Sequence, residues 1–141
     1  MRWVWGLWVG AFLFGTTAGW GADWQFYAKG EEYEFFYDAE SITAPDKNQV
    51  KVWVKIVADE EMVKRRFLAA SGKIPADEDL FSYQKLLTEI NCAERKQRNL
   101  TINNYSKNGK YLSSSAASTL GDWQMILPES FGDMLYKKVC K

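Results

Sequence analysis

Val50-Lys-Val-Trp-Val-Lys-Ile56 is the stretch that decides the fold. Its branched apolar side chains share one face of an extended chain: Val50, Val52, Val54 and Ile56. The opposite face carries Lys51, Trp53 and Lys55. This period of two predicts a β-strand whose valine face packs on the core. For Trp53, two interpretations stay open, because the ring either covers a second layer or lies in an exposed patch.

Strand-like runs continue on both sides of this stretch. Aromatic and branched residues concentrate in short segments, separated by Gly, Asn and Asp: 24–27, 33–37, 81–91, 99–105 and 111–112. Gly30 with Glu31 fits a hairpin turn between the first two runs. Asn108-Gly109 predicts another hairpin, with a type I′ turn that has positive φ at both residues.

Two runs also show which side chains face the core. Leu86, Thr88, Ile90 and Cys92 fall on one face by the same period of two, which directs Cys92 toward the core. In the following run, Leu100 and Ile102 are predicted to share a face.

Residues 59–80 interrupt the strand pattern, and we interpret them as a variable excursion. Acidic residues precede a modest helical stripe that Gly72 is placed to end, and a loop follows it. The basic run 64–66 is interpreted as a solvated helix face, with contact to an acidic ligand as the alternative. The acidic run 77–79 lacks the spacing and the glycine of a calcium loop.

The chain is predicted to end in a short amphipathic helix. Ser130 and Asp133 resemble a capping box with Asp in place of Glu. The apolar stripe that follows has helical spacing: Phe131, Met134, Leu135 and Val139. Cys140 lies at the last turn of this helix.

The first 22 residues predict a cleavable export signal. Arg2 precedes an apolar run over 3–14, and small residues follow it. Gly15, Thr16 and Thr17 interrupt that run before it reaches the roughly 18–20 residues of a membrane span. Residues 23–141 then form one domain with no membrane span. We expect this domain in the periplasm, at the cell surface or outside the cell.

The two cysteines of the chain, Cys92 and Cys140, are expected to form a disulfide in an oxidising compartment. Two buried free thiols are the alternative. Combined with the strand and helix patterns, the bond predicts an α+β, mainly β fold. It is an antiparallel meander of about six strands with a C-terminal helix packed on one face and tethered by the disulfide.

The composition excludes several classes of function. The chain has no histidine, so neither a histidine triad nor a histidine metal site can be built. Basic and acidic residues balance at 18 each, which gives no reason to expect nucleic acid as a partner. We predict no cofactor, no metal and no enzymatic activity. A hydrolase that uses a carboxylate pair is the alternative, with candidates that are only close together in sequence: Glu32, Glu34, Asp38 and Glu40.

The order of several short motifs resembles that of surface-adhesin protein E-like domains over about residues 24–141. The motifs are Glu34-Phe-Phe-Tyr-Asp38, Ser41-Ile42, Val50-Lys-Val-Trp-Val-Lys55, Glu89-Ile-Asn-Cys-Ala-Glu-Arg95, the Tyr105…Gly109 turn, Trp123…Ser130 and Val139-Cys140. The resemblance implies an antiparallel sheet disulfide-bonded to the C-terminal helix. It also implies an exported protein that can be displayed on the surface and can dimerise, in a family whose named member binds host matrix and plasma proteins.

The resulting prediction is an exported, non-enzymatic module that recognises protein partners. Exposed aromatic and basic side chains are the expected anchors: Trp53, Lys51, Lys55 and Tyr105. Open sheet edges make a homodimer possible. The alternative is a structural or accessory subunit of a bacterial envelope assembly.

Overall fold

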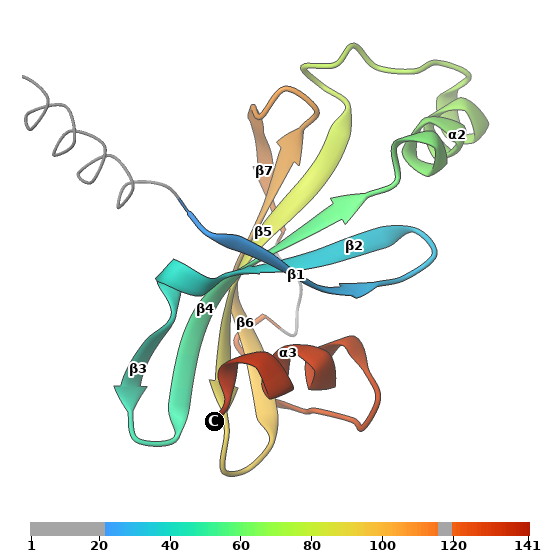
Figure 1. Ribbon diagram of the computed structural model, residues 1–141. Coiled ribbons are helices and arrows are strands. Elements are labelled where there is room, and N and C mark those ends of the chain that lie inside the picture. The colour runs from blue at the N-terminus through green and yellow to red at the C-terminus, as the bar shows by residue number, and fades with distance from the viewer. Residues whose placement is uncertain (1–21, 116–119) are drawn as a thin grey trace, which may run out of the picture.

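The computed structural model describes residues 22–115 and 120–141. Within them, all strands belong to one antiparallel sheet, in the order β1-β2-β4-β5-β6-β7, with β3 paired to β4 and β8 paired to β6 (Figure 1). The strands are β1 (Trp24–Lys29), β2 (Tyr33–Asp38), β3 (Thr43–Asp46), β4 (Gln49–Ala58), β5 (Phe81–Asn91), β6 (Lys96–Ser106), β7 (Tyr111–Ser114) and β8 (Gln124–Met125). Helical segments are η1 (Ala39–Ser41), α2 (Glu60–Ser71) and α3 (Phe131–Val139). The predicted meander of about six strands is confirmed as the main path, and the short strands β3 and β8 add to it. The predicted export signal lies almost wholly outside the described residues.

The central strand packs as its alternation predicts. In the β4–β5 ladder, Val52 lies opposite Thr88 and Val54 opposite Leu86. Val52 and Ile90 are fully buried, and both belong to the main hydrophobic cluster. Burial of a branched aliphatic side chain stabilises the fold by about 1.5–3 kcal/mol. We call this side of the sheet the covered face, because α3 packs on it.

Helix α3 closes the core with only part of its predicted stripe. Leu135 and Val139 are buried against the covered face, together with Ile126 from the segment before the helix. Phe131 and Met134, although they belong to the predicted stripe, stay about two-fifths exposed. Asp133 is buried instead. The apolar surface by which the helix packs on the sheet is therefore narrower than the predicted stripe, and a buried carboxylate lies beside it.

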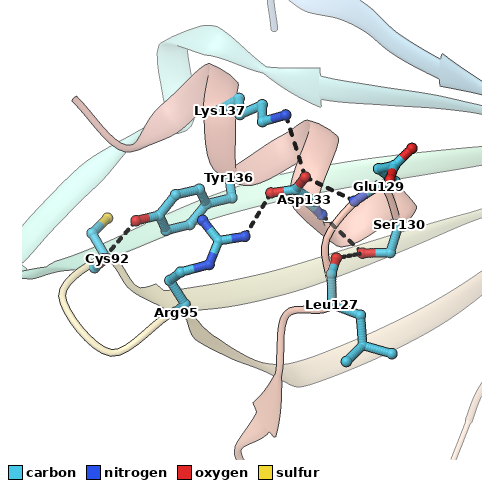
Figure 2. A network of polar contacts seen from close by, with 8 residues as sticks. All are labelled: Cys92, Arg95, Leu127, Glu129, Ser130, Asp133, Tyr136 and Lys137. Carbon is cyan, nitrogen blue, oxygen red and sulfur yellow. Dashed lines mark hydrogen bonds and ion pairs between the residues drawn. The ribbon is translucent and has the colours of Figure 1, made fainter.

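Polar contacts hold that charge and fix the helix (Figure 2). Ser130 caps the helix by accepting a hydrogen bond from the Asp133 amide, as predicted. The Asp133 carboxylate accepts hydrogen bonds from Arg95 at 2.8 Å and from the backbone amide of Glu129 at 3.0 Å. Glu129 is the residue before the cap. These contacts, with Lys137 at 3.4 Å, lower the pKa of Asp133 to about 2.

The predicted disulfide joins Cys92 to Cys140, with Cα atoms 5.7 Å apart. It ties the end of β5 to the residue after α3. Beside it, the Tyr136 hydroxyl donates to the Cys92 carbonyl at 2.7 Å, and Arg95 lies over the Tyr136 ring. The alternative of two free thiols is excluded in this structure.

Two local predictions were wrong. At the β6–β7 hairpin only Gly109 has positive φ, and its amide donates to the Ser106 carbonyl. This is a type I turn followed by a glycine bulge, which matches strand twist as a type I′ turn does. In β6, partners shift from Thr101 to Asn99, so Leu100 is the extra residue of a β-bulge and is out of phase with Ile102.

The 59–80 excursion contains the predicted helix. Asp59 caps α2 by accepting from the Met62 amide, and Gly72 ends it in the left-handed conformation that glycine favours. Met62 and Val63 pack with Ala58 and Leu80 in a second, smaller cluster. Helix α2 thus lies at the far end of β4, away from α3 (Figure 1).

Candidate functional site

The sheet face opposite α3 is the main concentration of aromatic and basic side chains in the described structure. We call it the open face. Strand register places these residues on it: Trp24, Phe26, Phe36, Lys51, Trp53, Lys55, Tyr83, Lys85, Leu87, Tyr105 and Tyr111. None of them belongs to the two clusters that hold α2 and α3. Over the described ranges, therefore, no helix packs on these side chains.

A pair of lysines lies near the middle of the open face. Lys55 of β4 and Lys85 of β5 are direct cross-strand partners, a position in which like charges repel. Aromatic rings surround both ammonium groups. Lys55 Nζ lies 4.8 Å from the centre of the Tyr83 ring and 5.4 Å from that of Trp24. Lys85 Nζ lies 5.3 Å from the centre of the Tyr105 ring and 5.9 Å from that of Trp24.

Cation–π contacts compensate part of the repulsion between the two lysines, at about 0.5–1 kcal/mol each on an exposed site. The charge itself is not neutralised. No described carboxylate lies within 4.0 Å of Lys55, Lys85 or Lys51. Burial, followed by the charge of Lys85, lowers the pKa of Lys55. The pair therefore offers an unsatisfied positive charge to a ligand.

Glu89, a buried carboxylate on this side of the sheet, is already paired. Glu89 lies opposite Lys51 across the β4–β5 ladder, but its Oε1 accepts a hydrogen bond from Arg98 Nε at 2.7 Å and forms an ion pair with Arg98 Nη2 at 2.6 Å. Arg98 in turn lies 4.3 Å from the centre of the Trp123 ring. This arrangement uses the acidic side chain to hold β5, β6 and the segment before β8 together, which leaves Lys51 without a partner.

The four residues predicted as anchors lie on the same face, and all are half-buried. Lys51, Trp53 and Lys55 follow one another along β4, while Tyr105 lies two strands away on β6. Tyr83 connects the two groups, since its ring stacks on Tyr105 at 5.1 Å and lies beneath Lys55. Trp53 is not covered by a described helix, which favours the exposed patch over the second layer.

Three members of this cluster were not among the residues predicted from the sequence: Trp24, Tyr83 and Lys85. Tyr83 and Lys85 could have been predicted, because they alternate with Leu86, Thr88 and Ile90 in the 81–91 run and so fall on the opposite face. The core-facing phase of that run alone does not identify them. Trp24 had no such signal, because its place beside the lysines depends on how the β1–β2 hairpin pairs with β4.

The carboxylates weighed for hydrolysis do not form a catalytic pair. A hollow of about 320 Å³ near the β1–β2 turn is lined by Glu32 and Glu34 but not by Asp38 or Glu40. Glu32 pairs with Arg66 at 2.6 Å, and Glu34 with Lys29 at 3.8 Å. Asp38 caps η1.

A general acid in this hollow would need a raised pKa. Glu60, which also lines the hollow, has its pKa lowered by hydrogen bonds from Lys64 and Lys107. The described part of the chain contains no group of three or more potential metal ligands. It also contains no helix long and apolar enough to cross a membrane.

Comparison with known proteins adds one finding. The family model described as surface-adhesin protein E matches residues 24–141, which is all but the first residue of the predicted domain and includes the 59–80 excursion. No curated protein matches the chain. No solved structure matches it.

Proposed function

Because the chain belongs to the surface-adhesin protein E family, we propose that it is an exported, non-enzymatic module that recognises a protein partner through its open face. Family membership suggests a surface adhesin. Membership also favours binding over catalysis, and an exported protein at the cell surface over one that stays inside. We propose in addition that the partner is a protein and that the open face binds it.

The observation that carries the proposal is the exposed cluster of rings and unpaired lysines on the open face. Aromatic side chains bury a large area at a small entropic cost, which is why they dominate protein interfaces. Phe26 and Tyr111 are each 53% exposed on two outer strands, so the aromatic surface extends across the sheet. A stable protein interface buries about 800 Å² on each partner. A sheet face of this width is a suitable platform for one.

The rigidity of the platform supports the same role. The open face is built on the β4–β5–β6 ladder, whose reverse side is the buried core. Side chains on such a scaffold lose little freedom when a partner binds, and this preserves affinity. Helix α3 packs on that reverse side, and α2 lies at the end of β4 (Figure 1).

A binding assay on purified surface, matrix and plasma proteins tests the proposal. We expect saturable binding of at least one of them. Trp53→Ala and Tyr105→Ala should each weaken it about ten-fold or more, as removal of an aromatic anchor does. Leu68→Ala is the matched control, because Leu68 is a 48% exposed apolar residue on α2. It should leave the affinity unchanged.

The proposal fails if the open-face variants fold normally and bind as wild type does. It also fails if the protein associates with a single envelope complex and with no purified surface protein. That second result would assign the chain to an envelope assembly as an accessory subunit.

A further inference from the structure

The lysine pair of the open face has a property that a general adhesive surface does not require. Two ammonium groups lie side by side on neighbouring strands, Lys55 opposite Lys85, with no carboxylate within 4.0 Å in the described structure. Most other basic side chains in strands and helices have such a partner, as Arg66 has Glu32 and Arg98 has Glu89. The pair thus places two unneutralised charges side by side, in contrast to most basic side chains of the strands and helices.

The rings around the pair fix where an anion would bind. Trp24 contacts both ammonium groups from β1, and Tyr83 and Tyr105 contact them from β5 and β6. Contact with these rings restricts the two long side chains, which otherwise lose much rotamer entropy when they form an ion pair. A carboxylate that bridges both ammonium groups would also cancel their mutual repulsion, which, after burial, lowers the pKa of Lys55 in the free protein.

From this geometry we infer that Lys55 and Lys85, framed by Trp24, Tyr83 and Tyr105, form a recognition site for an acidic peptide segment of the partner. The inference rests on the proposed function, since it names the chemistry of the partner at the open face. The anchor is a Glu or Asp carboxylate held between the two ammonium groups. Neighbouring apolar atoms of the segment pack on the rings.

The surroundings of the pair favour a peptide over a polyanion. Glu34 and Asp38 project on the same side of β2, and the chain as a whole carries no net charge. A nucleic acid or a highly sulfated glycan needs a long track of cations, because each phosphate or sulfate is neutralised in turn. On the open face, the cations without an ion-pair partner among the described residues are Lys51, Lys55 and Lys85. One or two carboxylates on an extended segment fit that number.

The test uses the protein with its Cys92–Cys140 bond intact and a synthetic peptide of alternating glutamate and glycine. An NMR titration measures the affinity and maps the amides that shift. We expect the largest shifts at Lys55, Lys85 and their neighbours. The matched peptide with glutamine in place of glutamate should bind at least about ten-fold more weakly, because charge-assisted hydrogen bonds are lost. Raising the NaCl concentration should weaken the glutamate peptide by screening the charges.

Two double variants separate the site from net charge. Lys55→Gln with Lys85→Gln should lose at least about ten-fold in affinity for the glutamate peptide. Lys73→Gln with Lys138→Gln makes the same change in charge at two exposed lysines outside the open face, and it should bind normally. Lys55→Glu with Lys85→Glu should reverse the preference, so that a lysine–glycine peptide binds in place of the glutamate peptide.

Three results would overturn the inference. The first is normal binding of the glutamate peptide to the Lys55→Gln, Lys85→Gln protein. The second is a shift map centred away from the open face. The third is saturable binding of heparin, of vesicles of anionic lipid or of a second copy of the chain at the lysine pair, with no binding of the peptide.

If Trp53→Ala impairs binding of a surface protein and the lysine double variant does not, the inference fails while the proposed function stands. If the peptide binds and no surface protein does, the proposed function fails.

Discussion

The two faces of the same sheet differ in what their side chains contact. On the covered face, Val52, Ile90 and Leu135 are buried, and a disulfide holds α3 over them. On the open face, residues from the same strands are half-exposed, and two lysines lie among rings with no anionic partner nearby. Because strand side chains alternate, each step along β4 moves from one environment to the other. We interpret the covered face as the source of stability and the open face as the source of binding.

The largest expected effect comes from the disulfide of the covered face. Cys140→Ser opens the loop of 48 residues between the two cysteines, which should cost about 4 kcal/mol on the chain-entropy model. Urea denaturation of the variant beside wild type measures this loss. A reducing agent should lower the stability of wild type by a similar amount and leave the Cys92→Ser, Cys140→Ser protein unchanged. Equal stability of the wild-type and variant proteins would show that α3 stays in place without its tether.

A matched pair on β5 compares the faces directly. Ile90→Ala leaves a cavity beneath α3 and should destabilise the fold by about 3 kcal/mol. Leu87→Ala, three residues earlier on the open face, should cost about 1 kcal/mol, because its side chain is only half-buried and solvent can fill the space. Thermal unfolding gives both values. The assignment of the two faces would be wrong if the order of these two losses were reversed.

Asp133 should make the covered face sensitive to acid. Its pKa is about 2 in the folded protein against 3.8 ordinarily, so the carboxylate contributes stability above about pH 4. That contribution is lost as the pH falls from about 4 toward 2, because the unfolded chain takes up the proton first. Urea denaturation between pH 5 and pH 2 should show a smaller decline for Asp133→Asn than for wild type. Asp46→Asn, at an exposed carboxylate on β3, should follow wild type.

The smallest effect on stability is expected for Lys51→Gln on the open face. Lys51 has no ion-pair partner among the described residues, so its loss should change the unfolding free energy by no more than about 0.5 kcal/mol. Its affinity for a surface protein should nevertheless fall a few-fold, because the variant removes one of the unpaired charges. A clear loss of stability with unchanged affinity would place Lys51 among the residues that hold the fold.

Sequence alternation predicted the fold well because it reports burial. The period of two in β4 and β5 identified the covered face, and the cysteines identified the tether of α3. Prediction from alternation failed where an extra residue shifts the strand phase, as at Leu100. It also failed where a buried charge replaces an apolar contact, as at Asp133. Neither the bulge nor the ion pair leaves a periodic pattern.

The candidate site was predicted in part for the same reason. The β4 alternation gave Lys51, Trp53 and Lys55 directly. The cluster itself depends on pairing between strands, which sets Lys85 opposite Lys55 and brings Trp24 over both. Which residues of two strands lie opposite each other depends on the strand register in the folded sheet. A single sequence therefore predicts which residues belong to the site more readily than how they are arranged.

The division between the two faces is tested most directly by one double variant, Lys55→Gln with Lys85→Gln, measured for affinity and for melting temperature in the same buffer. We predict that its affinity for the glutamate peptide falls at least about ten-fold while the melting temperature stays within about 4 °C of wild type. Unchanged affinity together with a large fall in melting temperature would contradict the account, because the lysine pair would then serve the fold and not the ligand.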